Sequence, residues 1–506
     1  MGAQMITDGA PTMDRSRERT AVVALACALV VFRAFVFVWW EQSHFDADQA
    51  IVGLMAKHLL EGRAFPLFFY GQQYLLGVES WLVAPFFLVG GMSVATLKFP
   101  ILLLNLIAVI LLITGLERFV GLRPWQAGLA SLFFILPPPS AASRLVQANG
   151  CNIEPFVYVL LIWFLRARPL WLGLVLGVGV LNREFTLYGF AALIAVEAWT
   201  RSLFSLDRLR GLALATLVAV GIWQAVQVLV PYASARGPGT SYAEVGVPTH
   251  AAEVQQRFCW NPDDLPSRLT TLAGFQLPEL FGAQSQPVVR VGIIGSTFQG
   301  VDGLWPLLVA TFTLVLARLS WLARSHITGV AGGSLAFGVY LLLIGSQSVI
   351  VYGVTCGQRS HLTMRYMLLG LLAPAGIAAC YLALERSRNL IRAFVAVVAS
   401  WAVISAAAHF ALLSEYVTDP PIAEYRLLTE YLDVHQVRHG RAAFWDAYAV
   451  TFLSNERVRL GSSDLVRVEE YVRQYEWHKE SAVVVSLSRC EGPQVARWWV
   501  CPARDR

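Results

Sequence analysis

The sequence is dominated by apolar runs, many of them about as long as a segment that crosses a lipid bilayer, although several are shorter. They begin at residue 21 and recur as far as residue 413, and clusters of arginines lie between many of them. Of the 506 residues, 56% are apolar and only 14% are charged, whereas soluble domains carry about 25% charged residues. Because about 20 apolar residues span the hydrocarbon core, the pattern predicts an all-α polytopic membrane protein.

Six groups of arginines lie between the apolar runs, and such residues concentrate on the cytoplasmic side of membrane proteins. The groups are Arg15, Arg17 and Arg19; Arg118 and Arg123; Arg166 and Arg168; Arg201, Arg208 and Arg210; Arg318 and Arg324; and Arg386, Arg388 and Arg392. Placing all six in the cytoplasm requires residues 79–117 to cross the membrane once, which gives about eleven spans. We therefore predict a helix in the outer interface at 79–91 and a span at 95–117. Lys98 is a positive charge inside this span and does not fit the prediction.

This topology divides the chain into three regions. Residues 1–20 form a cytoplasmic tail, residues 21–413 the transmembrane domain, and residues 414–506 a small soluble domain outside the cytoplasm. Within the transmembrane domain, residues 41–94 form the first outer loop and residues 232–302 a long outer loop. A loop of that length is usually functional or disordered.

The soluble tail shows features of a small α/β domain. Apolar alternation at residues 482–487 predicts a strand, and residues 465–475 predict a helix. Among the seven cysteines, Cys490 and Cys501 in this tail are the pair that can form a disulfide, while Cys27 and Cys380 lie inside apolar runs.

The first outer loop carries three carboxylates, Asp46, Asp48 and Glu79, among aromatic and aliphatic neighbours. A charge close to hydrocarbon is costly, so acidic residues at such positions are usually functional. The competing interpretation is structural, with Asp48 capping a helix and Asp46 lying in a solvated turn. We favour the functional interpretation and take all three as candidate catalytic residues.

The residues after Asp48 have helical periodicity. Ile51, Leu54, Met55 and Leu59 recur at the spacing of one helix face. The pattern predicts an amphipathic helix lying in the plane of the membrane, with Asp48 at or beside its start.

A carboxylate in this loop can accept the proton of a hydroxyl nucleophile. Asp46 and Asp48 also have the spacing of the acidic pair that binds a metal ion in soluble nucleotide-sugar transferases. Glu79 returns to the same surface, where it would support the base or, together with Asp48, hold a divalent ion. The sequence has no P-loop and no GxGxxG motif after a strand, so it predicts no nucleotide-binding domain.

Arginines on the outer face form a second group of candidates. A guanidinium binds phosphate through a planar fork and stays charged near lipid, so a lipid-borne phosphate is its natural partner. The alternative for each is that it anchors a helix end by snorkelling. These arginines are Arg144, Arg183, Arg359 and Arg365, and His361 beside the last two is a further candidate for the same phosphate.

Three segments occur in a characteristic order. FDADQAIVGLMAKHLLEG follows the first span, YGQQYLLGVESWLVAPFFLVGG comes next, and MRYMLLGLLAP lies much later. Together they resemble the GT-C superfamily of glycosyltransferases, whose donors are sugars on polyprenyl phosphates. The sequence looks closest to the bacterial relatives of protein O-mannosyltransferases and of the lipid A aminoarabinose transferase. The resemblance covers residues 20–415 and is dense at 44–97 and 361–375.

The resemblance implies an integral membrane enzyme whose first outer loop supplies the catalytic acid. Asp48 matches that acidic position and Glu79 matches the second acid. Arg183 matches a basic residue that contacts the lipid phosphate in a later outer turn, and Arg365 with Tyr366 matches an arginine–tyrosine pair.

The sequence also departs from this family. Family members often have Asp-Glu in the first loop, whereas Gln49 follows Asp48 here and Asp46 precedes it. Which aspartate is the base therefore stays open. The lysine-proline-proline run of the aminoarabinose branch is absent, which argues against that substrate.

These features predict transfer of a sugar from a polyprenyl phosphate to a hydroxyl of a glycan, lipid or protein acceptor. The reaction would take place on the extracytoplasmic face of the bacterial cytoplasmic membrane, among membrane lipids. The net charge of +5 comes from arginines between the spans and does not indicate nucleic-acid binding. A divalent ion is the one cofactor that the residues suggest.

Two alternatives stay open. One is a lipid-linked-sugar flippase or transporter, whose signature would be charged or broken segments in the middle of several spans, in paired halves. The polar residues here gather instead on one face. The other alternative is a non-catalytic protein of the same fold.

Overall fold

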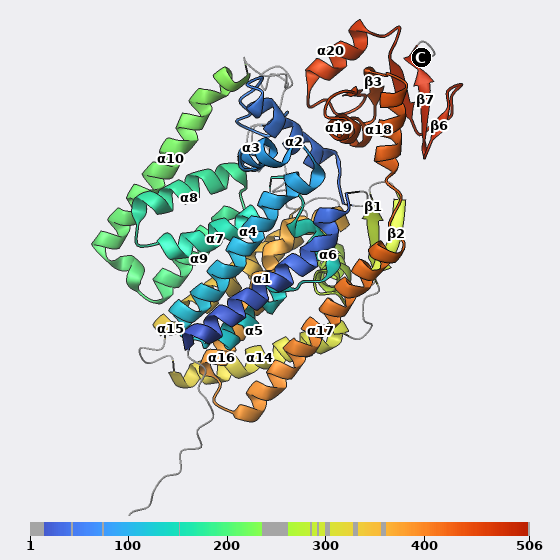
Figure 1. Cartoon of the computed structure of the whole chain (residues 1–506). Helices are drawn as coiled ribbons and strands as arrows, with labels where there is room; N and C mark the ends of the chain where they lie inside the picture. Colours follow the sequence, from blue (N-terminus) through green and yellow to red (C-terminus); the bar gives the residue numbers. More distant parts are fainter. Residues whose placement is uncertain are drawn as a thin grey trace, which may run out of the picture.

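The computed structural model of the protein describes residues 15–41, 44–72, 75–150, 152–234, 262–283, 286–290, 293–298, 304–326, 332–355 and 361–503. A helical bundle makes up most of the chain, and a small α/β domain sits at one end of it (Figure 1).

Seven helices of the described chain are long and apolar enough to cross a membrane. Helices suit this environment because they satisfy their backbone hydrogen bonds internally. In chain order they are α1 (Arg15–Trp39), α4 (Val94–Gly115) continued by the π-helix η1 (Leu116–Val120), α10 (Leu206–Ser234), α14 (Leu304–His326), α15 (Gly332–Val354), the 3-10 helix η4 (His361–Leu371) continued by α16 (Leu372–Leu384), and α17 (Arg388–Thr418).

The other four expected spans are shorter helices. They are α5 (Pro124–Ile135), α7 (Glu154–Leu165), α8 (Pro169–Asn182) and α9 (Thr186–Trp199), of 12 to 14 residues. At 1.5 Å per residue, 14 residues cover about 21 Å of a hydrocarbon core about 30 Å thick. The predicted count of eleven spans is therefore not confirmed, although a helix occupies each expected position.

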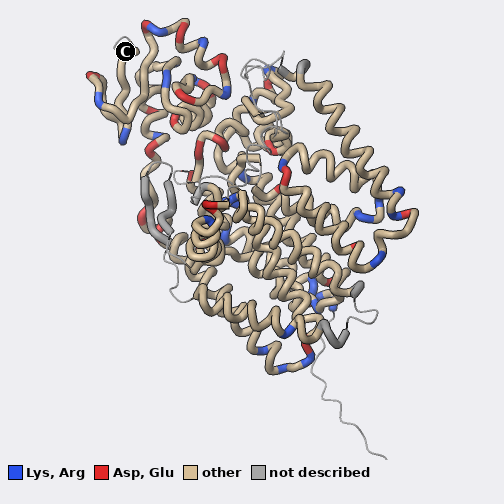
Figure 2. The backbone as a smooth tube through the Cα atoms, turned by 180° about the vertical axis from the view of Figure 1, so that it is seen from behind, with Lys and Arg blue, Asp and Glu red and all other residues tan. Residues whose placement is uncertain are grey.

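The arginine groups at the ends of the first helices meet in space. Arg19 of α1 forms an ion pair with Glu117 of η1 at 3.1 Å. Arg166 follows α7 and stacks on Phe119 of η1, with the guanidinium 4.8 Å from the ring centroid. Arg208 of α10 donates to the carbonyl oxygen of Arg166 at 2.6 Å. Figure 2 shows that charged residues gather at the ends of the bundle and in the α/β domain.

Lys98 and Arg33 lie inside the bundle and are bonded there. The ammonium of Lys98 donates to the carbonyl oxygens of Phe37 at 2.8 Å and His44 at 2.5 Å. Arg33 donates to the side chain of Asn105 at 2.7 Å. Lys98 thus ties α4 to the residues where α1 ends, which explains why a charge occurs in this span.

Two helices lie in the segment expected to form the first outer loop, α2 (Ala47–Leu60) and α3 (Val78–Gly90). The helix expected at 79–91 is confirmed as α3. The helix expected after Asp48 is present as α2. The expectation that it is buried on one side alone is wrong, because α2 is also buried on the opposite side, at Val52, Gly53 and Ala56. There the α/β domain covers it: a Cβ added to Gly53 would lie 2.2 Å from a ring carbon of Phe452.

The α/β domain contains the elements expected in the tail. Its sheet has the strand order β4-β3-β5-β7-β6, in which β3 runs parallel to β4 and β5, and β7 runs antiparallel to β5 and β6. The predicted strand and helix are β5 and α20. The elements are α18 (Glu424–Val434), β3 (His439–Ala442), α19 (Phe444–Leu453), β4 (Arg459–Ser462), α20 (Glu469–Trp477), β5 (Val483–Ser486), β6 (Gln494–Val495) and β7 (Trp498–Pro502).

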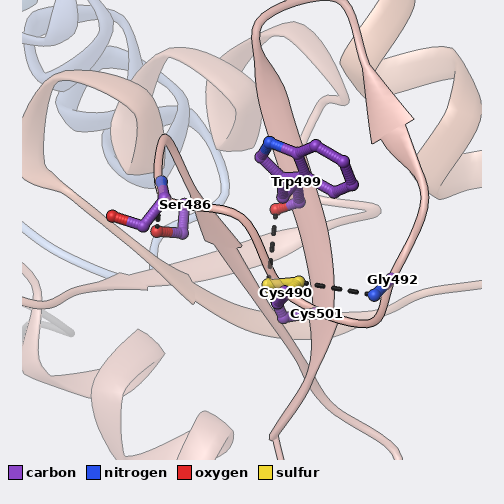
Figure 3. The surroundings of a disulfide bond; sticks show 6 residues. Ser486, Cys490, Gly492, Trp499 and Cys501 are labelled. Atoms are coloured by element: carbon purple, nitrogen blue, oxygen red, sulfur yellow. Dashed lines mark hydrogen bonds between the residues drawn. A yellow bond between two sulfur atoms is a disulfide. The ribbon is translucent and has the colours of Figure 1, made fainter.

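The disulfide expected in this domain is confirmed. Cys490 and Cys501 are bonded, which ties the segment before β6 to strand β7 (Figure 3). Cys27 and Cys380 are free thiols of the bundle.

The remaining elements are short connections. A large part of the segment expected to form the long outer loop, 235–261, lies outside the described residues. The connections are α6 (Pro139–Leu145) and η2 (Ser202–Phe204) and, in the long loop, α12 (Leu265–Thr271), η3 (Leu272–Gln276), α13 (Leu277–Leu280) and the antiparallel pair β1 (Gln286–Arg290) and β2 (Ile293–Phe298).

Candidate active site

Asp46 is the N-cap of α2. Its backbone is extended, and its side chain accepts a hydrogen bond from the backbone N–H of Gln49 at 3.1 Å. A capping carboxylate satisfies one of the free N–H groups at a helix start. The structural alternative that made Asp48 the cap and Asp46 a solvated turn is therefore wrong, because the cap lies two residues earlier, at Asp46.

Asp48 lies in the first turn of α2 and faces Arg365 of η4. The two side chains are 3.8 Å apart, Nη1 to Oδ2, and both are partly exposed. Burial raises the pKa of Asp48, and the negative charge of Asp46 acts in the same direction, while Arg365 and Arg467 oppose the shift. Asp48 is thus a carboxylate that binds a proton more readily than an ordinary aspartate.

Tyr366 lies between two guanidinium groups. The guanidinium of Arg365 lies 5.2 Å from its ring centroid and that of Arg183 lies 5.5 Å from it. Arg365 also donates to the Tyr366 hydroxyl at 3.3 Å. Arg183 follows the last residue of α8, is only 4% exposed, and stacks on Phe185 as well. The structure thus brings Arg183, Arg365 and Tyr366 together beside Asp48.

Arg144 of α6 belongs to the same charged neighbourhood. Burial lowers its pKa to about 10, the positive charge of Arg365 acts in the same direction, and Asp46 opposes them. At neutral pH the guanidinium stays charged. Its side chain donates to Gln147 at 3.4 Å, and its carbonyl oxygen accepts from Asn152 at 2.6 Å.

The start of α2 is bound to the loop that follows α6. The side-chain amide of Gln49 donates to the carbonyl oxygen of His44 at 3.0 Å and accepts from the N–H of Ala148 at 3.3 Å. Gln49 is fully buried and joins these two segments. This contact holds the aspartates and Arg144 in one region.

Glu79 begins α3 and is 1% exposed. Its carboxylate accepts from the N–H of Gly150 at 2.6 Å, and the side chain of Asn182 donates to the carbonyl oxygen of Gly150 at 3.1 Å. The backbone of Gly150 has φ +80°, which favours glycine. Glu79 therefore connects α3 to the residues beside Arg183.

Arg467 is a neighbour of Asp48 that the sequence did not indicate. It comes from the α/β domain, and its guanidinium donates to the carbonyl oxygen of Gly71 at 2.8 Å and lies over the ring of Phe69. Its positive charge, like that of Arg365, lowers the pKa of Asp48 and so opposes the effect of burial. No local signal marks it, because nearly the whole bundle separates it from Asp48 in the sequence.

A group of five side chains attaches the α/β domain to α2, and we call it the Glu456 cluster. It consists of Lys57, His58, Arg63, Glu456 and Tyr471. The carboxylate of Glu456 accepts from Tyr471 at 2.7 Å, is 2.8 Å from Arg63 and 3.2 Å from His58, and pairs with Lys57. Burial opposes its ionisation, but the bonds from His58, Lys57 and Tyr471 outweigh burial and lower its pKa.

Two candidates lie outside what the structure describes. They are Arg359 and the side chain of His361, whose backbone begins η4. Among the described residues, no group of three or more His, Cys, Asp or Glu side chains is placed to hold a metal ion.

Known structures share this architecture. No protein-family model and no curated protein matches the sequence. ArnT from Cupriavidus metallidurans, in the apo state, matches over 95% of this chain and 97% of that chain, with a TM-score of 0.57 and 10% sequence identity.

The oligosaccharyltransferase AglB of Archaeoglobus fulgidus also matches, in two structures. Its apo form covers 92% of this chain and 69% of that chain at 12% identity, with a TM-score of 0.47. Its complex with an inhibitory peptide and a dolichol-phosphate covers 88% and 64% at 13% identity, with a TM-score of 0.48, so the chain spans about two thirds of AglB. The similarity to ArnT establishes the fold, which is the GT-C type that the sequence resembles.

Proposed function

We propose that this protein is a membrane glycosyltransferase that moves a sugar from a polyprenyl phosphate to an acceptor hydroxyl. The ion pair between Asp48 and Arg365 supports this proposal, because a carboxylate, the proposed proton acceptor, lies 3.8 Å from a guanidinium, the proposed phosphate ligand. Arg183 and Arg144 lie beside this pair. A guanidinium matches the geometry of a phosphate, so three of them beside Asp48 suit an anionic donor.

In the proposed reaction, the acceptor oxygen attacks the anomeric carbon of the sugar while Asp48 takes the hydroxyl proton. The bond from the anomeric carbon to the phosphate oxygen breaks, and its electron pair stays on the polyprenyl phosphate. Arg365 and Arg183 stabilise the charge that develops on that oxygen. Arg365 contacts Asp48 in the structure, and the donor phosphate would compete with Asp48 for it.

The proposed location of the reaction is the extracytoplasmic face of the bacterial cytoplasmic membrane. Disulfides persist in oxidising compartments, and the Cys490–Cys501 bond belongs to the domain that covers α2. The arginine groups lie away from that domain (Figure 2), as the positive-inside rule requires for a site outside the cytoplasm.

Substitution of the two aspartates tests the proposed base. Purified Asp48→Asn protein should lose transfer from a radiolabelled polyprenyl-phosphate hexose by a factor of about 10² to 10⁴, measured with lipid, glycan and peptide acceptors. Asp46→Asn should retain part of the activity, because Asp46 acts as a helix cap. Glu476→Gln, on the exposed side of α20, is the matched control. Full transfer by both aspartate variants would overturn the proposed base.

The divalent ion suggested for Asp48 and Glu79 stays a prediction. Glu79 accepts from Gly150, so a shared ion would require it to leave that contact. If an ion is needed, dialysis against EDTA should abolish transfer, and Mg²⁺ or Mn²⁺ should restore it. Unchanged transfer after dialysis would exclude this role.

A further inference from the structure

A charged cavity lies at the end of the bundle away from the candidate active site. Its volume is about 580 Å³, and α1, the end of α4 with η1, and the start of α5 line it. The lining begins at Arg15, whereas the proposed active site follows the other end of α1. The 25 residues of α1 rise about 37 Å along the axis, so the two sites are separate.

Arginine dominates the charge of this cavity. Arg15, Arg19 and Arg118 line it together with one acid, Glu117. Arg19 pairs with Glu117 at 3.1 Å and donates to Thr114 at 3.3 Å. Within the described chain, Arg15 and Arg118 form no ion pair with a carboxylate. Two positive charges are therefore left in excess at the cavity wall.

The local backbone brings Glu117 and Arg118 to the wall together. They lie in η1, a π-helical turn that continues α4 and ends at Gly121, where φ is +82°. Adjacent residues of an ordinary helix point about 100° apart, and a π-turn widens the helix locally. π-Helical turns are rare in proteins, and many of those that occur lie at functional sites.

The cavity opens where apolar helix faces begin. Leu25 of α1 is 62% exposed, and Trp125, next to the lining residue Pro124, is 39% exposed. Tryptophan is enriched at the membrane interface. A ligand with a charged head in the cavity would find apolar surface for its chains beside it.

We propose that this cavity binds the phosphate group of an anionic membrane lipid. Basic pockets between transmembrane helices on the cytoplasmic side bind acidic lipid headgroups, and the arginine fork matches phosphate geometry. Arg15 and Arg118 bind the phosphate, and Arg19 is held in place by Glu117 and Thr114. The proposal is independent of the transferase activity, because no residue is shared between the two sites.

Native mass spectrometry of the purified full-length chain tests this proposal. The protein should retain phosphatidylglycerol in preference to phosphatidylethanolamine, and Arg15→Gln/Arg118→Gln should reduce this preference by about tenfold or more. The matched control is Arg17→Gln/Arg123→Gln. It removes the same charge from the same end of the bundle, at exposed residues outside the lining, and should keep the preference.

Two further measurements complete the test. Thermal unfolding of each variant checks that it is folded, and the two single variants replace the double variant if that protein is unstable. An equal loss in the cavity and control variants would overturn the proposal, because it would indicate unspecific surface charge. Displacement of the lipid by inorganic phosphate alone would assign the cavity to a soluble phosphate and overturn the lipid assignment.

Discussion

Asp46 and Asp48 share one helical turn but have different surroundings. Asp46 is engaged as the cap of α2, whereas Asp48 faces Arg365. A general base is most effective when its pKa lies near the working pH, and the surroundings of Asp48 move its pKa in that direction. The structure therefore favours Asp48 as the proposed base and Asp46 as a neighbour whose negative charge raises the pKa of Asp48.

The pH dependence of transfer should report this arrangement. Transfer needs the Asp48 carboxylate, so activity falls as the pH drops through its pKa. Asp46→Asn removes a negative neighbour and should move this acid limb to lower pH, while Arg467→Gln removes a positive neighbour and should move it to higher pH, each by up to about one unit. Arg473→Gln, exposed on α20, should leave the limb in place. Shifts in the same direction would contradict Asp48 as the titrating base.

The contact between α2 and the α/β domain determines how the site is enclosed. The Glu456 cluster holds one end of α2, and Phe452 of α19 lies against Gly53 in its middle. Asn455 and Glu456 have φ of 55° and 61°, a conformation that few non-glycine residues adopt. Several bonds to the Glu456 carboxylate hold this turn in place.

Glu456→Gln should weaken the attachment of the domain. It leaves Lys57, Arg63 and His58 without their shared carboxylate, and removing one partner of a buried ionic group typically costs about 3 kcal/mol or more. The expected result is a lower unfolding temperature and faster proteolysis at the domain boundary, with Glu476→Gln unchanged.

The pH dependence of this attachment follows from the lowered pKa of Glu456. A depressed carboxyl pKa stabilises the fold above the unfolded value of about 4.3, and this contribution is lost as the pH falls through the lower folded value. The difference between wild type and Glu456→Gln should therefore be present at neutral pH and shrink in strong acid. A difference that vanished near neutral pH would contradict this role of Glu456.

Gly53 should tolerate no side chain. The added Cβ would lie 2.2 Å from the Phe452 ring, and overpacking of this kind costs about 1–3 kcal/mol. Gly53→Ala should lower the unfolding temperature, and Gly53→Ala/Phe452→Leu should recover part of the loss. Gly211→Ala, where a Cβ meets nothing within 4 Å, is the control. No loss in Gly53→Ala would show that α19 does not press on α2.

The whole molecule has two chemically distinct ends. The α/β domain, its disulfide and the two aspartates are at one end, and the arginine groups and the charged cavity are at the other. Such an arrangement is expected of a protein that crosses the membrane in one orientation, with its apolar helices in the lipid between the two ends.

Labelling of single cysteines should establish that orientation. In intact cells, a membrane-impermeant maleimide should label Lys479→Cys on the α/β domain, while Arg168→Cys should react only after permeabilisation. Both positions are exposed, and the unsubstituted protein gives the background. The opposite pattern would place the proposed active site in the cytoplasm.

Much of the architecture was predictable because hydropathy acts locally. Apolar runs predicted where the bundle helices lie, and the disulfide and the α/β elements of the tail followed from local pattern. The number of spans was not predictable, because helix length depends on where caps and turns interrupt each run. Four of the expected spans are only 12 to 14 residues long.

The sequence by itself determined a membrane bundle of the GT-C type and a set of candidate carboxylates and arginines. It could do so because the burial of apolar surface and the cost of placing charge near lipid both act on short segments. Only the tertiary structure decided that Asp46 is the cap, that Asp48 meets Arg365, and that Arg467 approaches from the last domain. The physical reason is that such contacts join residues distant in sequence. Their free energy comes from packing and pairing across the fold, which no local pattern records.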